Sequence, residues 1–251
     1  CHRLLDYGNV DDAFEEADLV LKERLVFPRY SSTPLETYAI IADHDPISGV
    51  LTIRSNFMGP FTMHLVTATA LGLPENKLRF ISPTDIGGSF GIKSSMYPYI
   101  ALIGLAAMKA GRPVKWIEDR QEHLMASSSQ TDRTVYREVA FKNDGTLIGI
   151  KSKVIDGIGA YLRAPEPGTT FRPIATIVGP YKVRNVRVDA YVVFTDKCPT
   201  GPNRGYGCAH LYFEQERMMD LAARELGMDP AEIRRRNFID ADAFPYTTPT
   251  G

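Results

Sequence analysis

Residues 134–141 and 147–155 alternate apolar with polar side chains, and the turn sequence KNDG lies between them at 142–145. Alternation with a period of two is typical of a β-strand, and an Asp-Gly pair between two such runs is a strong short-range signal for a hairpin. We therefore expect two antiparallel strands here, and any fold of this chain must contain them.

The rest of the chain mixes strand and helix signals. Strand-like runs occupy 19–27, 38–42, 50–55, 77–81, 113–117 and 186–194. The turn-rich segment HDPISG at 44–49 predicts that 38–42 and 50–55 are antiparallel neighbours. Helical patterns with cap or glycine stop signals cover 10–17, 60–71, 95–110, 120–125, 209–226 and 229–238. This mixture predicts an α+β fold with mixed and antiparallel sheets and packed helices, and a subdivision near 130 into 1–130 and 131–251.

Composition excludes several classes of protein. The chain has 251 residues, of which 44% are hydrophobic and 24% charged, which is ordinary for a globular protein that buries a core. A formal charge of −1 provides no general attraction for phosphates, so we expect no nucleic-acid binding. The most apolar stretch, 99–108, is far shorter than the roughly 20 residues that cross a bilayer. We expect a soluble chain that does not enter a membrane.

Cysteine usage indicates a reducing compartment. Cys1, Cys198 and Cys208 form no CxxC pair, and their odd number argues against a disulfide framework and against a zinc site. A cytoplasmic location follows as an expectation. The sequence opens on Cys1 without a targeting leader, which predicts a piece of a longer chain.

Glycine-rich segments are the first candidates for a binding site. The loop IGGSFG at 86–91 lies between a predicted strand and a predicted helix, where glycine lets backbone N–H groups approach an anion, although a plain tight turn is equally consistent. It lacks the glycine that precedes lysine in a nucleotide-binding P-loop. Two other fragments, 157–162 and 205–210, imitate a dinucleotide fingerprint but end in Leu and His, so we reject a Rossmann domain.

Histidine and serine patterns predict no site of their own. The five histidines contain no HExxH and no pair at i, i+4, so a metal held by protein side chains is not expected. His210 deserves a closer look because it follows a glycine-rich turn, although a polar core role is the simpler interpretation. The serines at 127–129 lack the context of a nucleophile and are expected at a helix end.

Two loops framed by proline and glycine carry arginines. The sequence RAPEPG at 163–168 precedes Arg172, and CPTGPNRGYG at 198–207 contains Arg204. The guanidinium group is suited to bidentate recognition of anions and oxo groups, whereas a single surface arginine more often forms a salt bridge. Together with the loop at 86–91, these segments favour one pocket lined for an anion, with separate surface salt bridges as the alternative.

These loops resemble those of a known family. The sequence DIGGSFGIK at 85–93, the segments GRPVKWIEDR at 111–120 and YKVRNV at 181–186, the turn NRGYG at 203–207 and DPAEIRRRNF at 229–238 resemble the large subunit of the molybdenum hydroxylases. That family includes xanthine dehydrogenase, aldehyde oxidase and the carbon monoxide dehydrogenase large chain. The resemblance implies the first half of a molybdopterin-binding region, in which a pterin dithiolene holds the molybdenum.

The resemblance also implies site residues. Cofactor contacts are expected from the loop beside the metal's oxo group and from the arginine of the 203–207 turn, that is from Met58, Gly59, Gly87, Gly88, Phe90, Gly91 and Arg204. Arg172 matches a substrate-orienting arginine, ten positions before Lys182, and Tyr206 matches an aromatic that stacks on planar substrates. With Ser94, these residues are expected to contact the substrate.

Departures from the family pattern restrict the substrate. Met58 stands where the family has a glutamine that donates to the oxo group; either the register shifts and Asn56 donates, or the site is altered. Ser94 replaces a glutamate that binds purines, which disfavours xanthine. Gly205 replaces a cysteine that bridges copper, which disfavours carbon monoxide. An aldehyde or an aromatic N-heterocycle, oxidised with water as oxygen source, is the expected substrate.

The implied enzyme is larger than this chain. The family's base, a glutamate in a later domain, lies outside it, so no catalytic side chain is expected here and the isolated chain is expected to be inactive. Expected partners are the remaining molybdopterin-binding domain or subunit, an iron–sulfur subunit and an FAD subunit in a hetero-oligomer; a dinucleotide form of the pterin is also expected. The alternative is a noncatalytic fragment or a split-gene assembly subunit that requires a second cofactor-binding chain.

Overall fold

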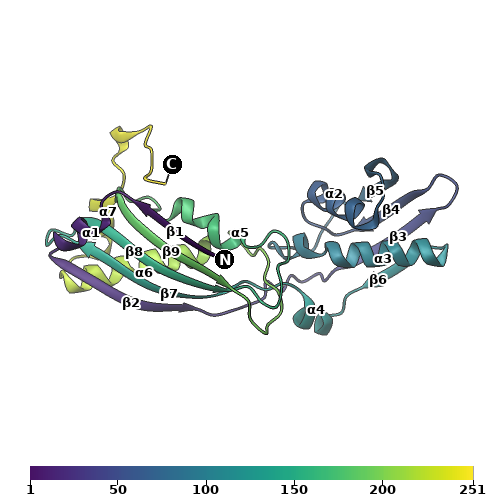
Figure 1. The fold of residues 1–251 in the computed structure, drawn as a ribbon, viewed down its shortest axis with the longest axis horizontal. Coiled ribbons are helices and arrows are strands. Elements are labelled where there is room, and N and C mark those ends of the chain that lie inside the picture. Colours follow the sequence, from purple (N-terminus) through teal and green to yellow (C-terminus); the bar gives the residue numbers. More distant parts are fainter. Residues whose placement is uncertain (251) are drawn as a thin grey trace.

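A computed structural model describes residues 1–250 as an elongated molecule of two lobes joined at a narrow waist (Figure 1). One lobe is built on a five-stranded sheet and the other on a four-stranded sheet. Each sheet has its own hydrophobic core of buried side chains. The structure is α+β with both mixed and antiparallel pairing, as the sequence predicts.

The five-stranded sheet has the order β1-β9-β8-β7-β2. Its members are β1 (His2–Tyr7), β2 (Leu19–Phe27), β7 (Asp132–Phe141), β8 (Leu147–Gly157) and β9 (Asn185–Val193). The hairpin predicted around 142–145 is the antiparallel pair β7–β8. Strands β8 and β9 are parallel, so the chain must cross over between them, and residues 158–184 form this connection. The crossover carries Arg172 to the waist.

Helices cover this sheet on the side where its valines and isoleucines are buried. The long helix α6 (Cys208–Glu225) contributes Leu211, Met218, Met219, Ala222 and Ala223 to the core. Helix α7 (Pro230–Asn237) packs beside α6 and is capped by Asp229, whose carboxylate accepts from two backbone N–H groups. The short elements α5 (Gly168–Phe171) and η3 (Pro173–Thr176) lie within the crossover. Helix α1 (Val10–Glu15) packs on the opposite face of the sheet, where Asp11 binds Lys151 of β8 and Arg187 of β9. The turn η4 (Ala241–Ala243) follows α7.

The four-stranded sheet has the order β5-β4-β3-β6. It consists of β3 (Ala39–Asp45), β4 (Val50–Ser55), β5 (Leu78–Ile81) and β6 (Val114–Ile117). Strands β3 and β4 are antiparallel neighbours, as predicted. Helices α2 (Pro60–Leu71) and α3 (Tyr97–Ala110) contribute to its core, and each ends at a left-handed glycine, Gly72 and Gly111.

Shorter elements complete this lobe. They are η1 (Glu75–Lys77), η2 (Ile92–Ser95) and α4 (Arg120–Ala126). Helix α4 begins with a capping box, in which Asp119 and Glu122 each bind the other's backbone N–H. The helix predicted over 95–110 starts two residues later, at Tyr97 of α3, and Ser95 is the last residue of the preceding 3-10 turn η2.

Two features differ from the expectations or go beyond them. Strand β1 was not predicted, because it is a largely exposed edge strand without apolar alternation that is held by pairing with β9. The four-stranded lobe is inserted between β2 and β7, two strands that pair with each other over the whole length of β2. A boundary near 130 falls at the return, while residues 1–27 share the sheet of the C-terminal part. The domain division stays a prediction.

Within residues 1–250, no helix has the length and apolar character that a membrane span requires.

Candidate functional site

Two loops that are far apart in sequence meet at the waist. The backbone N–H of Arg204 donates to the carbonyl oxygen of Phe90 over 2.8 Å. Next to this bond, Gly91 lies so close to the other loop that a Cβ there would be 2.4 Å from the carbonyl oxygen of Pro202. The segments 87–91 and 202–207 are thus in direct backbone contact, and only glycine permits this approach at position 91.

Both loops hold a bulky residue in an unusual backbone conformation. Phe90 has φ 53° and Tyr206 has φ 54°, a left-handed region that is rare for aromatic residues. Neighbouring glycines carry the sharp turns, because Gly91 has φ 111° and Gly207 has φ 90°. Backbone strain of this kind is retained where the surrounding structure fixes it, and it is concentrated at functional sites. Both aromatic side chains line the same cavity.

The cavity has a volume of about 620 Å³. It lies between the lobes and is lined from the four-stranded lobe by Met58, Phe90 and Gly91. From the other lobe it is lined by Arg172, by η3, by residues 202–206 and by Cys208. Six of the residues predicted from the sequence face it together: Met58, Phe90, Gly91, Arg172, Arg204 and Tyr206. The convergence that the sequence predicts for these loops is therefore present in the fold.

A second cavity of about 410 Å³ adjoins the first and shares Met58, Arg172, Pro202 and Tyr206 with it. The predicted residues Gly59 and Ser94 line this second space. Much of its remaining wall is apolar or aromatic: Met63, Val66, Tyr97, Ala164 and Pro165. Such a lining favours a flat apolar molecule with few polar groups.

Arg172 and Tyr206 form the boundary between the two spaces. The guanidinium carbon of Arg172 lies 5.1 Å from the centre of the Tyr206 ring, within the range of a cation–π contact. Burial, together with the negative charge of Glu166, raises the pKa of the Tyr206 hydroxyl against the opposing charge of Arg172. The tyrosine is therefore neutral at physiological pH and presents an aromatic face to the cavity.

The first glycines of the loop serve a different purpose. Gly87 donates its N–H to Glu36 over 3.0 Å, and Gly88 packs against Pro34 and the ring of Phe90. Neither lines either cavity. Glu36 also accepts from the buried ammonium of Lys93 at 2.5 Å. Burial opposes its ionisation, but the hydrogen bonds from Lys93, Asn56 and Gly87 outweigh this and hold the pKa of Glu36 below its ordinary value.

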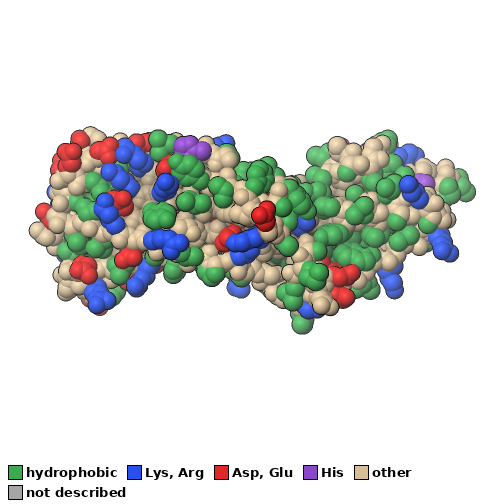
Figure 2. Space-filling model, turned by 60° about the horizontal axis from the view of Figure 1, so that its bottom comes forward, with side chains coloured by type: hydrophobic (Ala, Val, Ile, Leu, Met, Phe, Trp, Pro, Cys, Tyr) green, Lys and Arg blue, Asp and Glu red, His purple; other side chains and the backbone are tan. Residues whose placement is uncertain are grey.

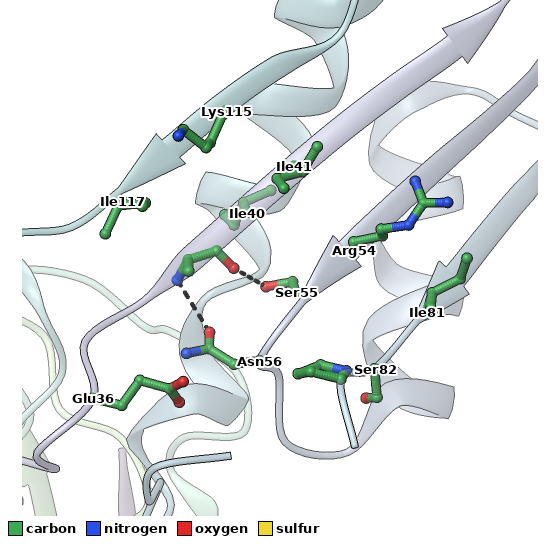
Figure 3. A pocket seen from close by; sticks show the side chains of 12 residues that line it. Glu36, Ile40, Ile41, Arg54, Ser55, Asn56, Ile81, Ser82, Lys115 and Ile117 are labelled. Atoms are coloured by element: carbon green, nitrogen blue, oxygen red, sulfur yellow. Dashed lines mark hydrogen bonds between the residues drawn. The ribbon is translucent and has the colours of Figure 1, made fainter. Parts of the chain in front are cut away.

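Asn56 lies away from these two cavities. Its side chain accepts from the N–H of Ala39 at 3.1 Å and donates to the carbonyl of Thr37 at 2.8 Å, so it is committed to the start of β3. Figure 3 shows it at a separate hollow of about 260 Å³ on the four-stranded sheet, among Glu36, Ser55 and Ser82. Met58, by contrast, is 45% exposed and lines both cavities, with its sulfur accepting from the Ser89 hydroxyl. Of the two candidates for the glutamine position, only Met58 faces the waist.

His210 has a structural role. It is fully buried, and its Nε2 lies 3.1 Å from the carbonyl oxygen of Thr131, while Nδ1 lies 2.9 Å from the amide nitrogen of Gln130. Burial, aided by the positive charge of Arg133, lowers its pKa to about 4. The neutral ring is a polar core residue that joins α6 to the segment before β7. The fragment 157–162 is likewise structural, since Gly157 ends β8.

Comparison with known proteins decides the family. A family model described as the molybdopterin cofactor-binding domain matches residues 2–238. The chain belongs to this family. The resemblance drawn from the loop sequences is thereby confirmed.

Relatives of this molybdopterin-binding domain are larger proteins. The 6-hydroxypseudooxynicotine dehydrogenase complex subunit gamma of Paenarthrobacter nicotinovorans is 35% identical over 246 residues, which are 96% of this chain and 30% of that protein. The carbon monoxide dehydrogenase large chain of Hydrogenophaga pseudoflava is 35% identical over 98% of this chain and 31% of its own. The structure of quinoline 2-oxidoreductase from Pseudomonas putida 86 superposes with a TM-score of 0.94 at 30% identity, covering 100% of this chain and 32% of that chain. The domain spans about a third of each.

The donors at the waist of this molybdopterin-binding domain suit an anionic group. Asn203 is 3% exposed and its Oδ1 accepts from Ser32, but its Nδ2 has no hydrogen-bond partner within residues 1–250. Asn203 and Arg204 line the larger cavity side by side. Among the described residues, no three His, Cys, Asp or Glu side chains lie together as a metal site. A buried amide donor beside a guanidinium fits phosphate or oxo groups of a pterin cofactor.

Three residues line the site although the sequence analysis assigned them no role. Asn203 was noticed only as a neighbour of Arg204, although its orphaned amide is a notable donor. Tyr97 lines the smaller cavity without any motif of its own, and Pro202, within the quoted loop 198–207, lines both cavities without having been assigned a role. The glycine and proline content of the segment 198–207 around Arg204 was the one local signal available. The remaining information lies in the packing of the two lobes.

Proposed function

We propose that this chain supplies one wall of the molybdenum cofactor site in a larger hydroxylase. Arg204, Asn203 and the backbone of residues 90–91 would hold the anionic parts of the cofactor, with Met58 and Gly59 on the opposite side. Gly87 and Gly88 would act indirectly, by fixing the turn that presents Phe90. The bound cofactor supplies two-electron oxidation of the substrate with oxygen taken from water. The observation that carries this proposal is the contact between Phe90 and Arg204 at the rim of one cavity.

The same geometry supports a planar substrate. Tyr206 offers an aromatic face for stacking, Arg172 offers a fixed positive charge, and Ser94 lies in the apolar second cavity. An aromatic N-heterocycle or an aldehyde suits these groups, and quinoline in the name of a structural neighbour belongs to the first class. In this proposal the side chains of this domain bind and orient the substrate, while proton transfer is left to a group outside it.

Partner chains complete the proposed enzyme. Hydrophobic side chains gather over the waist and over much of the four-stranded lobe, whereas charges of both signs are interspersed over the five-stranded lobe (Figure 2). Large exposed hydrophobic side chains of the four-stranded lobe include Leu35, Ile117, Leu124 and Met125. Such a surface supports contact with further protein. We propose that this hydrophobic surface binds the second cofactor-binding part of the enzyme, and that iron–sulfur and FAD partners receive the electrons. The proposed cofactor is a dinucleotide form of the pterin, and the proposed place of assembly is the cytoplasm.

The proposal is tested at Arg204 in the assembled enzyme. Arg204→Ala removes a charge-assisted contact worth roughly 1.5–3 kcal/mol, so molybdenum content by metal analysis should fall about tenfold or more. Arg204→Lys keeps the charge but not the planar guanidinium group, so its molybdenum content should lie between those of wild type and Arg204→Ala. Arg217→Ala, at an exposed position of α6, is the matched control and should retain full occupancy. Unchanged molybdenum content and turnover in Arg204→Ala would refute the proposal.

A further inference from the structure

Glu166 is a buried carboxylate in the crossover that the proposed cofactor and substrate contacts do not use. Its side chain lies in the loop 163–168, and the residue is 9% exposed. Burial raises the pKa of its carboxyl against the hydrogen bonds that it accepts from Thr169 and Thr200. A carboxylate is costly to bury unless its oxygens are hydrogen-bonded, so its partners show what it holds in place.

The carboxylate of Glu166 connects the two segments that line the cavities. One oxygen, Oε2, accepts from the hydroxyl of Thr169 and, at 3.3 Å, from its backbone N–H. The other oxygen, Oε1, accepts from the hydroxyl of Thr200 at 3.2 Å. Thr169 lies in α5, which leads directly into Arg172, and Thr200 begins the segment that leads to Arg204 and Tyr206. A single side chain thus ties the two loops together.

A second carboxylate anchors the same turn to the sheet. Thr170 donates its hydroxyl to Asp156 at 2.5 Å, and the two oxygens of Asp156 are also held by Arg133 of β7, at 2.7 Å each. Neighbouring threonines of α5 are therefore fixed in two directions, one toward the sheet and one toward the 200–207 loop. The backbone that leads into Arg172 is therefore held in place.

Close packing leaves no space for a side chain between these loops. A Cβ on Gly207 would lie 2.0 Å from the carbonyl oxygen of Thr169, and a Cβ on Gly168 would lie 2.5 Å from the hydroxyl of Tyr206. Because the backbones touch, a change in the tie between α5 and the 200–207 loop alters the position of Arg172 relative to Tyr206 directly.

We propose that Glu166 is a positioning residue that sets the gap between Arg172 and Tyr206, and thereby the affinity for a planar substrate. This inference rests on the proposed function, because it assigns the substrate to that gap. Glu166 touches neither the substrate nor the cofactor in this account. It acts through the two loops that its carboxylate joins.

A glutamine can replace the carboxylate in this geometry. The amide oxygen still accepts from Thr169, and the amide nitrogen donates to Thr200, whose hydroxyl already has an alternative acceptor in the carbonyl of Ile158 at 3.3 Å. An alanine leaves the hydroxyl and the backbone N–H of Thr169 without this acceptor and removes the link to Thr200. Glu166→Gln should therefore preserve the gap, whereas Glu166→Ala should not.

The test is steady-state kinetics of the assembled enzyme, with quinoline as the first probe and otherwise the best N-heterocycle or aldehyde that it oxidises. Glu166→Ala should raise KM about tenfold, as expected for losing buried hydrogen bonds, with kcat and molybdenum content close to wild type. Glu166→Gln should stay within about threefold of wild type. In an Arg172→Ala background the effect of Glu166→Ala on KM should largely vanish, because both act on one contact.

Amide hydrogen exchange gives a readout that does not depend on turnover. Residues 168–172 should exchange faster in Glu166→Ala than in wild type, and Glu166→Gln should restore their protection. An unchanged KM, or a KM effect that persists fully in the Arg172→Ala background, would overturn the role of Glu166. A loss of molybdenum from Glu166→Ala would also overturn it, since the residue would then support the cofactor. Retained molybdenum in Arg204→Ala defeats the proposed function itself, so the two failures are distinguishable.

Discussion

Arg204 donates its backbone N–H to the carbonyl oxygen of Phe90 at 2.8 Å, although 114 positions separate the two residues in the chain. The bond joins the two lobes at the wall of the larger cavity. Its geometry depends on the left-handed backbone of Phe90 and on the absence of a side chain at Gly91. The candidate site is therefore a property of the interface between the lobes rather than of either lobe alone.

Replacing Gly91 by alanine tests this contact. The variant meets both a φ of 111° and a carbonyl oxygen 2.4 Å from the new Cβ, so we expect a loss of more than about 2 kcal/mol in the free energy of unfolding. Gly179→Ala is the control, because Gly179 has φ 57° but open space around it; it should cost about 1 kcal/mol. Chemical denaturation of the two variants measures the difference. Equal losses would show that the close approach at Gly91 is not retained in solution.

The buried pair of Arg133 and Asp156 predicts a large stability effect. Asp156→Asn leaves the guanidinium of Arg133 buried with Glu214 as its remaining acidic neighbour, at 3.6 Å, and should destabilise the protein by roughly 3–5 kcal/mol. The exposed pair of Lys22 and Glu138 supplies a comparison, since Glu138→Gln should cost at most about 1 kcal/mol. Thermal unfolding midpoints of both variants check this. Similar midpoints would mean that Asp156 is not a structural partner of Arg133.

His210 predicts a dependence of stability on pH. Its pKa is lowered to about 4 in the folded state, so between pH 6.5 and about 4 the unfolded chain takes up a proton that the folded chain does not. Stability should therefore fall with decreasing pH across this window, by about 1.4 kcal/mol per pH unit from this group. His210→Asn cannot titrate and should show a shallower slope than wild type between pH 6.5 and 4.5. Parallel slopes would mean that the ring is not buried in its neutral form.

Tyr206 predicts selectivity for flat substrates. Tyr206→Leu removes the stacking face and should raise KM for an N-heterocycle by about fivefold to tenfold, as expected from losing an aromatic contact of about 1 kcal/mol or more. Tyr206→Phe keeps the ring and should differ little from wild type. The comparison is made by steady-state kinetics of the assembled enzyme. A larger effect of phenylalanine than of leucine would assign the role to the hydroxyl instead.

Much of the fold follows from local patterns. The bounds of β2, β4 and α2 agree with the sequence pattern, because alternation, Pro60 at a helix start and Gly72 at its end are all local signals. Strand β1 could not be found, since its side chains are mostly exposed and it forms only because β9 offers an edge. The pairing of β2 with β7 spans more than a hundred residues, and no local feature encodes it.

The candidate site was predictable only in part, for a similar reason. Gly91, Arg172 and Arg204 stand in loops whose glycine and proline content marks them in the sequence. The free amide of Asn203 and the bridging carboxylate of Glu166 depend on which neighbours the fold brings to them. The separation of Asn56 from Met58 likewise follows from the start of β3, which claims both polar ends of the Asn56 side chain.

In the proposed enzyme, the loops 87–91 and 202–207 together hold the cofactor. An experimental structure of the assembled, molybdenum-loaded enzyme tests it most directly. We expect density for the cofactor in the cavity at the waist, with an anionic group within hydrogen-bond distance of the Arg204 guanidinium or the Asn203 amide. Cofactor density at another place, with only solvent between Phe90, Asn203 and Arg204, would contradict it.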